Sequence, residues 1–216
     1  MAAHHPRRGL RDWRELMLND HGFLRLSWHN LHEISPGVWR SNQPTPGRID
    51  AAARNGIRTI INLRGPRSDG GWRLEKEACD ANNMALVDFT IRSRAVPDRE
   101  VIFEAERVFS EIEYPVLMHC KSGADRAGIM AALYLLLMED APAAVAAEML
   151  SFKYLHVSQA KTGLLDAFIA AYADAEKRGL SFRDWVQDEL DPAAIHNAFQ
   201  SRSWADRLVD GLLRRE

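Results

Sequence analysis

The sequence predicts an α/β fold in which a central, mainly parallel sheet of about four to five strands is flanked by helices, with helical extensions at both ends. Three observations lead to this prediction. Between residues 37 and 139, short runs rich in Val, Ile and Leu alternate with longer stretches of helical spacing. From residue 143 onward the spacing of apolar residues is helical throughout. With 46% hydrophobic and 27% charged residues, the composition is ordinary for a folded globular protein.

The strands are predicted from short runs of apolar and β-branched residues. Residues 57–63 (IRTIINL) form a near-continuous run, which is typical of a parallel strand buried on both faces. Residues 115–119 (PVLMH) repeat this pattern. Two further strands are expected at residues 37–41 and 85–91. Because helical segments separate these runs, we expect a parallel sheet covered on both faces.

The helices are predicted where apolar residues recur every three or four positions. The most apolar helix, from Ala127 to Glu139, is too short to cross a bilayer, for which about 20 residues are needed. It is therefore expected to lie in the core, and no stable membrane insertion is expected. Asp191 and Pro192 form a typical helix start, and Ser181 begins a sequence that resembles a capping box. The predicted helices cover residues 10–18, 49–55, 72–83, 98–112, 127–139, 143–152, 161–177, 181–188 and 192 to about 213.

Charge and cysteine content narrow the classes of function. The 216 residues carry 28 basic and 30 acidic side chains, so the net charge of −2 gives no reason to expect nucleic acid as a partner. The two cysteines, Cys79 and Cys120, cannot make a disulfide scaffold. Residues 1–30 carry charges throughout, which argues against a secretory signal. We expect a cytoplasmic location, and we see no signal for an oligomeric state.

The segment from His119 to Gly128 (HCKSGADRAG) carries the strongest chemical signal. It follows a predicted buried strand and opens a predicted helix, so its backbone N–H groups and the helix N-terminus should form a nest for an oxyanion. Gly123 permits the backbone twist that this nest needs, and Arg126 offers a planar fork to two phosphate oxygens. The same donors should favour the thiolate of Cys120, which would lie at the centre.

This segment resembles the signature loop of the cysteine-dependent protein tyrosine phosphatases, in which His-Cys is followed by five residues and Arg. The resemblance extends from about Val38 to Tyr172, and Arg-Ser-Asn-Gln-Pro (40–44) and Ile-Asn-Leu-Arg-Gly (61–65) are similar to segments of bacterial dual-specificity-type phosphatases. It implies a phosphatase-like fold with an N-terminal arm at 1–33, a phosphatase domain at 34–177 and a helical C-terminal extension at 178–216.

The resemblance also implies a hydrolase that forms a phosphocysteine intermediate and needs no cofactor or metal. Cys120 would attack phosphorus, and Arg126 would stabilise the transition state. The phosphate cradle would be formed by Lys121, Ser122, Gly123, Ala124, Asp125 and Arg126. His119 would orient the loop. The substrate would be a phosphorylated protein, or a phosphorylated small molecule or lipid head group.

Two features depart from the family pattern. The position after Arg126 is usually Ser or Thr, whose hydroxyl assists the second step, and here it is Ala127. The usual upstream Asp is also missing from the end of the strand at 85–91. Asp125 is the first choice for the general acid because a loop residue is already close to the leaving oxygen. The alternatives are Asp98, which could simply cap a helix, and Asp88, which should lie within a strand.

Basic residues near the expected site suggest a substrate rim. Arg64 ends one predicted strand, and Arg92 and Arg94 follow another. Because ligands gather at the carboxyl ends of strands in open α/β sheets, these side chains and Lys121 could form a basic rim for a polyanionic substrate. Arg40 and Gln43 could also approach the site. A general Arg-rich composition explains the same residues equally well.

Other interpretations of the same residues stay open. Cys79 has helical spacing typical of a core residue, although relatives that protect the nucleophile by a reversible disulfide suggest pairing with Cys120. Arsenate reduction and sulfur transfer also use a cysteine in an oxyanion loop, but the mid-chain position of Cys120 argues against them. A phosphoinositide or lipid-phosphate phosphatase is a further alternative. Ala127 and the missing upstream Asp also allow a non-catalytic phosphate-binding module.

Overall fold

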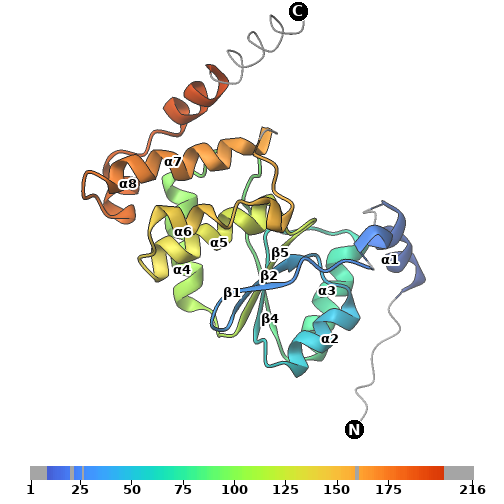
Figure 1. Ribbon diagram of the computed structural model, residues 1–216. Helices are drawn as coiled ribbons and strands as arrows, with labels where there is room; N and C mark the ends of the chain where they lie inside the picture. Colours follow the sequence, from blue (N-terminus) through green and yellow to red (C-terminus); the bar gives the residue numbers. More distant parts are fainter. Residues whose placement is uncertain (1–8, 20–21, 26, 159–160, 202–216) are drawn as a thin grey trace, which may run out of the picture. The chain divides into compact units, whose positions relative to one another are not determined.

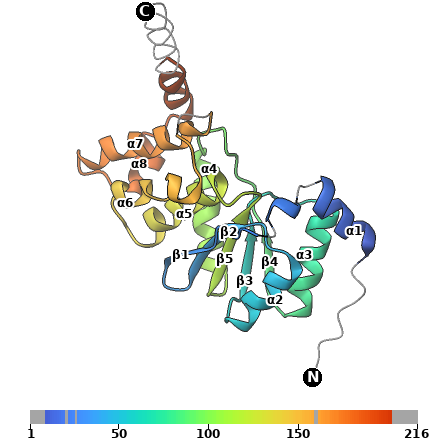
Figure 2. The ribbon, with the colours of Figure 1, turned by 45° about the vertical axis from the view of Figure 1, so that its right-hand side comes forward.

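A computed structural model describes residues 9–19, 22–25, 27–158 and 161–201 (Figures 1 and 2). The chain divides into two compact units. The first contains the chain up to residue 91 together with residues 107–131, and the second contains residues 92–106 and the chain from 132 onward. In the part of the chain that is described, no helix is long and apolar enough to cross a membrane.

The first unit contains a five-stranded sheet in the order β1-β2-β5-β3-β4. The strands are β1 (His32–Ser35), β2 (Val38–Asn42), β3 (Thr59–Asn62), β4 (Ala85–Asp88) and β5 (Val116–Cys120). All neighbouring strands run parallel except β1 and β2, which form an antiparallel hairpin. The expected α/β fold with a mainly parallel sheet is therefore confirmed. Strand β5 lies in the centre and brings Cys120 beside Asn42 of β2.

Strand β1 was not expected from the sequence. Its four residues are mostly half-buried and contain charged and polar side chains, so they lack the apolar run that marks β3 and β5. Gly37 adopts a φ of 76° in the connection to β2, a conformation that favours glycine. The hairpin thus adds an edge strand to a sheet whose other four strands were predicted.

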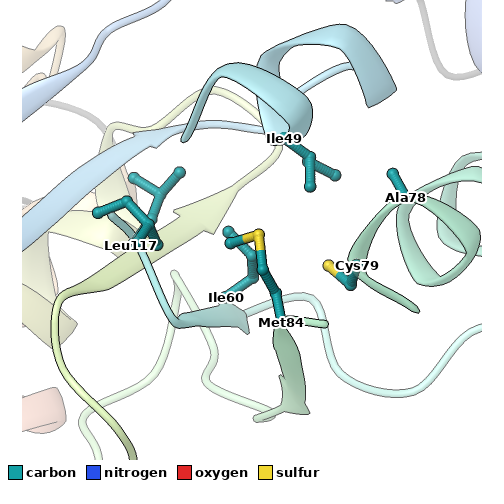
Figure 3. Close-up of a cluster of buried hydrophobic side chains, with 7 residues drawn as sticks. Ile49, Ile60, Ala78, Cys79, Met84 and Leu117 are labelled. Atoms are coloured by element: carbon teal, nitrogen blue, oxygen red, sulfur yellow. The ribbon is translucent and has the colours of Figure 1, made fainter. Parts of the chain in front are cut away.

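Three helices of the first unit are α1 (Leu10–Arg14), α2 (Pro46–Arg54) and α3 (Gly70–Ala81). A short π-helical turn at Glu15–Asn19 and a 3-10 turn at Gly22–Arg25 follow α1. Helices α2 and α3 pack on one face of the sheet through a cluster of buried apolar side chains (Figure 3). Its buried members are Ile49, Ile57, Ile60, Ala78, Cys79, Met84 and Leu117. This cluster fixes α3 against β3 and β5.

Two helices have residues in both units. Helix α4 spans Arg99–Glu111, and α5 spans Asp125–Met138 and begins immediately after the loop that follows β5. Helix α5 is almost entirely buried from Ala127 to Leu137, as expected for a core helix.

The second unit is helical. It includes α6 (Ala143–Ala147), 3-10 turns at Phe152–Tyr154 and Lys161–Gly163, α7 (Leu164–Glu176), α8 (Phe182–Asp188) and helical residues 192–201. Phe168 and Tyr172 of α7 pack against Phe182 and Trp185 of α8, with ring centroids 4.9–6.2 Å apart. The predicted caps are confirmed, since Ser181 Oγ accepts from the Asp184 N–H at 3.1 Å and Asp191 Oδ1 from the Ala194 N–H at 2.9 Å.

Several predicted helix bounds were wrong. The helix predicted at 49–55 begins at Pro46, because proline is well suited to the first helical turn. The helix predicted at 143–152 ends at Ala147, and the one predicted at 161–177 is α-helical only from Leu164. Part of the predicted N-terminal arm and the end of the last predicted helix lie outside the described residues.

Candidate active site

The loop of residues 120–126, which we call the Cys120 loop, connects β5 to α5 at the carboxyl end of the central strand. Cys120 is the last residue of β5 and is only 2% exposed. Asp125 and Arg126 form the first turn of α5 and are half-buried. The chain thus passes from a buried strand through a tight turn into a helix N-terminus, which is the arrangement expected of an oxyanion nest.

Gly123 is required at the tightest point of this loop. Its φ is 77°, a conformation that residues with a side chain rarely adopt. A Cβ atom at this position would also lie 2.7 Å from the backbone nitrogen of Asn42 and the carbonyl carbon of Ser41. The Cys120 loop therefore lies directly against the end of β2, and only glycine allows this approach.

Arg40 of β2 contacts the loop from outside it. Its side chain has 0% exposure, and its Nη2 donates to the carbonyl of Gly123 at 2.8 Å and to that of Ala124 at 2.9 Å. A buried guanidinium needs such partners, because an unsatisfied buried charge is costly. Arg40 thus holds two loop carbonyls on the side of β2.

The carbonyls of Lys121 and Ser122 also accept hydrogen bonds from residues outside the loop. The Asn30 side chain donates to the carbonyl of Ser122 at 3.2 Å, and the Gln43 N–H donates to that of Lys121 at 3.5 Å. In a planar trans peptide the C=O and the following N–H point in opposite directions. Four carbonyls held outward therefore turn the N–H groups of residues 122–125 toward the interior of the loop.

One of these N–H groups reaches the sulfur of Cys120. The Gly123 N–H donates to Cys120 Sγ at 3.2 Å. The loop leads directly into the N-terminus of α5, whose first N–H groups give a positive potential at this end of the helix. The loop thus combines a buried cysteine with an N–H donor to its sulfur, and Arg126 follows in the first turn of α5.

A buried polar network supports the loop from the side of α3. His119 Nε2 pairs with Glu75 Oε1 at 2.5 Å, and both residues are at most 1% exposed. The other Glu75 oxygen accepts from Gln43 Nε2 at 3.3 Å, and Gln43 Oε1 in turn accepts from Arg64 Nη1. The orientation of the histidine before Cys120 is therefore fixed by a carboxylate on a separate element.

The three carboxylates considered as general acids lie in different surroundings. Asp125 lies within the Cys120 loop. Asp98 is exposed and caps α4, where its Oδ1 accepts from the Val101 N–H at 3.0 Å. Asp88 ends β4, and its oxygens accept from Trp72 Nε1 at 3.0 Å and from Asn62 Nδ2 at 2.7 Å. The capping role considered for Asp98 is confirmed, and Asp88 is engaged in a structural network.

The residues of the predicted basic rim belong to two different units. Arg64 and Lys121 are half-buried and belong to the first unit, but the guanidinium of Arg64 bonds inward to Gln43. Arg92 and Arg94 are exposed and belong to the second unit. The rim as a whole stays a prediction.

Two further residues singled out in the sequence are buried in apolar surroundings. Ala127 has 0% exposure in the first turn of α5. Cys79 lies in the cluster between α3 and the sheet, and burial raises the pKa of its thiol to about 12, so it stays protonated at neutral pH (Figure 3). Both cysteines are free. The core role of Cys79 is therefore favoured over a role as a reactive thiol.

Glu75 and Asn30 were missed by the sequence analysis. Glu75 is four residues before Cys79 on the buried face of α3, and a carboxylate at such a position signals a buried partner. Asn30 lies in a stretch without periodicity and gave no comparable signal. Within the described residues, no group of three His, Cys, Asp or Glu side chains could hold a metal ion.

Comparison with known proteins supports the same interpretation of the loop. Residues 28–163 match a family model described as "DSP-PTPase phosphatase fused to NAD+ Kinase". The dual specificity protein phosphatase TpbA of Pseudomonas aeruginosa strain UCBPP-PA14 is 28% identical over 111 residues, which are 51% of this chain and 48% of that protein. Inositol diphosphatase DSP3 of Arabidopsis thaliana is 26% identical over 107 residues, 47% of this chain and 51% of that protein. The chain thus spans about half the length of these curated relatives.

Solved structures share the fold. A Cys→Ser variant of P. aeruginosa TpbA in complex with phosphotyrosine has a TM-score of 0.56 at 21% identity, over 74% of this chain and 91% of that one. The catalytic core of the PP-IP phosphatase SIW14 from S. cerevisiae has a TM-score of 0.52 at 14% identity, over 68% and 93%. Because the family model covers more than half of the sequence and includes the whole Cys120 loop, this chain belongs to the DSP-PTPase phosphatase family.

Proposed function

We propose that this protein hydrolyses phosphomonoesters through a phosphocysteine intermediate on Cys120. One observation carries the proposal: Arg40, Asn30 and Gln43 bond four loop carbonyls from outside the loop, and within the loop the Gly123 N–H donates to Cys120 Sγ at 3.2 Å. Such a preorganised cradle of donors stabilises negative charge on a phosphoryl group without rearrangement during the reaction.

In the first step, the Cys120 thiolate attacks phosphorus. The S–P bond forms while the P–O bond to the leaving group breaks, and Asp125 donates a proton to the departing oxygen. Arg126 and the inward N–H groups hold the non-bridging oxygens. The products of this step are the free alcohol or phenol and phosphocysteine.

In the second step, water attacks the phosphocysteine. The Asp125 carboxylate accepts a proton from the water, the P–O bond forms and the S–P bond breaks, which releases inorganic phosphate and restores the thiolate. A hydroxyl after Arg126 would donate to the departing sulfur. Since Ala127 has none, we expect this step to limit turnover.

The Glu75–His119 pair acts as a positioning pair. Its buried contact fixes the imidazole directly beside the nucleophile, and Gln43 extends the contact to Arg64. Because neither residue forms part of the loop interior, they act on the reaction through the loop rather than on the phosphate.

As substrate we propose a phosphorylated protein of the tyrosine or dual-specificity type. The supporting observations are the likeness to TpbA, described as a dual specificity protein phosphatase, and the fold shared with its phosphotyrosine complex. Phosphotyrosine needs no positive charge beyond the cradle, because its remaining surface is an apolar ring.

The second candidate is a polyanionic phosphate, such as an inositol phosphate or a phosphoinositide head group. Lys121 lies within the loop and Arg64 lies two residues after β3, so both could meet additional phosphates, and the relative DSP3 is described as an inositol diphosphatase. Replacing Lys121 by Ala distinguishes the candidates. It should weaken the hydrolysis of an inositol polyphosphate at least tenfold and leave a phosphotyrosine peptide nearly unaffected, with the difference shrinking at high salt.

The direct test of the chemistry is Cys120→Ser, with Cys79→Ala as the matched control. We expect Cys120→Ser to lose all measurable hydrolysis of para-nitrophenyl phosphate and to retain binding of orthovanadate or phosphate, because the backbone cradle is intact. Cys79→Ala should retain activity. Residual turnover above a few per cent in Cys120→Ser would contradict the phosphocysteine route, and binding without turnover in the unaltered protein would identify a non-catalytic phosphate-binding module.

A further inference from the structure

A cavity of about 480 Å³ lies in the first unit between helix α2 and the sheet surface of the β1–β2 hairpin and β5. No residue of the described Cys120 loop lines it. Its size is within the range of pockets that bind small molecules. It is therefore separate from the candidate active site, and nothing in the proposed chemistry uses it.

The walls of the cavity are mostly apolar. Trp39 of β2, Leu117 of β5 and Ile57 lie on the side of the sheet, and Ala51 and Ala52 lie on α2. Because the two alanines are short, α2 leaves space where larger side chains would close against the sheet. Such walls fit a hydrocarbon chain or an aromatic ring.

One end of the cavity carries the guanidinium of Arg48. His29 and Arg48 line it, and Arg48 Nη1 bonds to Asn42 Oδ1 at the end of β2 at 3.4 Å. Burial lowers the pKa of Arg48 and the nearby Arg25 lowers it further, while burial and Arg48 together lower the pKa of His29. His29 is therefore neutral at neutral pH, and an anionic group at this end would be attracted by the Arg48 guanidinium and could accept a hydrogen bond from the His29 imidazole.

The acidic lining residue lies toward the other end. Of the described residues that line the cavity, Glu33 alone is acidic, and its carboxylate accepts from the Gly37 N–H at 3.0 Å in the hairpin. In the β1–β2 pairing, Glu33 lies opposite Trp39. Trp39 is three residues before Asn42 on β2, so the two positions are about 10 Å apart along the strand. The charge of the cavity is thus polarised along its length.

We propose that this cavity binds a small amphipathic anion, with its apolar body along Trp39 and α2 and its single anionic group at Arg48 and His29. A medium-chain carboxylate and an aromatic sulfonate both have this chemistry. The cavity of about 480 Å³ has room for one apolar group and one anionic group. We therefore expect the occupant to be a free small molecule in solution. This proposal does not depend on the hydrolytic function.

The test uses 8-anilinonaphthalene-1-sulfonate as a fluorescent probe and decanoate as its competitor, with the full chain. We expect saturable probe fluorescence, displacement by decanoate, and much weaker displacement by the neutral decanol. Arg48→Gln should weaken both anions at least tenfold. Arg54→Gln is the matched control, because it removes a positive charge from an exposed position of the same helix outside the cavity, and it should behave like the unaltered protein.

A second variant tests the apolar part. Ala51→Trp should fill the space beside α2 and abolish probe binding while para-nitrophenyl phosphate hydrolysis persists. Saturating orthovanadate should leave the probe bound. Full competition by orthovanadate, equal displacement by decanol and decanoate, or indifference to both Arg48→Gln and Ala51→Trp would each overturn the proposal. The proposal would also be overturned if a second copy of the chain covered the cavity. In that case sedimentation would depend on protein concentration and the probe would not bind.

Discussion

Asp125 has the position from which a loop carboxylate could reach a leaving oxygen. It begins α5 directly before Arg126, whereas Asp98 is committed to the cap of α4 and Asp88 to hydrogen bonds with Asn62 and Trp72. Asp125 therefore stays the first choice for the general acid.

The prediction for this residue concerns leaving-group dependence. Asp125→Asn should lower kcat about 100-fold or more for an alkyl phosphate or phosphotyrosine, because the leaving oxygen must then depart without a proton. The loss should be much smaller for an aryl phosphate with an acidic phenol. Steady-state kinetics on both substrates measures the difference. Asp98→Asn is the control, and the assignment is wrong if that variant, rather than Asp125→Asn, shows the dependence.

At the scale of elements, β2 supports both candidate sites. Successive residues of a strand face opposite sides of the sheet. Arg40 accordingly reaches the Cys120 loop, while its neighbours Trp39 and Ser41 line the cavity beside α2. The end of the same strand lies against Gly123. One short strand thus shapes the loop from one face and a separate cavity from the other.

Arg40→Met tests how β2 supports the loop. The variant keeps much of the side-chain volume and leaves the carbonyl of Gly123 without the donor seen in the structure, which should cost about 1–3 kcal/mol of stability. The carbonyl of Ala124 also loses Arg40 but keeps the Gly128 N–H, which donates to it at 2.8 Å. Chemical denaturation measures this loss. Because the N–H groups would no longer be held inward, kcat should also fall at least tenfold at a temperature where the variant is fully folded.

Arg54→Met, which alters an exposed arginine of α2, serves as the control and should change neither quantity. Unchanged kcat in folded Arg40→Met would show that the loop holds its shape without the guanidinium.

At the scale of the whole molecule, helices α7 and α8 form an aromatic core in the second unit. Phe182, Trp185 and Val186 of α8 are buried, and the rings of Phe168, Tyr172, Phe182 and Trp185 contact one another. Segment 178–190 therefore packs as part of this unit. The boundaries at residues 33 and 177 stay predictions.

Trp185→Ala should destabilise this unit by about 3–5 kcal/mol, because it removes a large buried ring and leaves a cavity. Thermal unfolding followed by calorimetry measures the effect. The exposed Arg183→Ala on the same helix is the control and should have a small effect, since its ion pair with Glu106 lies at the surface. A loss below about 1 kcal/mol in Trp185→Ala would mean that α8 contributes little to the unit.

The parts of the fold that follow from short-range patterns were predictable. The sequence alone predicted the apolar runs of β3 and β5 and the capping residues Ser181 and Asp191. It also predicted that Cys120 lies between a strand and a helix. Strand β1 was not, because its residues have neither an apolar run nor a clear alternation. The length of the helix after Ala143 was overestimated, since periodicity does not reveal where tertiary packing ends a helix.

In the candidate site, too, some residues could be predicted from the sequence and others could not. The cysteine, the glycine and the arginine of the loop follow from their spacing. The supports of the loop do not, because Glu75 and His119 are 44 residues apart and Arg40 and Gly123 are 83 residues apart. Such contacts depend on strand order and register, which bring β2 and α3 beside the loop. The cavity beside α2 is likewise a product of tertiary packing.

The measurement that tests the central claim most directly is acid-quenched rapid mixing with a phosphorylated substrate, followed by peptide mass spectrometry. Because Ala127 is buried and offers no hydroxyl to the departing sulfur, the account predicts a burst of leaving group and phosphate attached to Cys120. Ala127→Ser should reduce the burst and the trapped species. Linear release of leaving group from the first turnover, with no phosphate on Cys120 at any quench time while hydrolysis proceeds, would contradict the phosphocysteine mechanism.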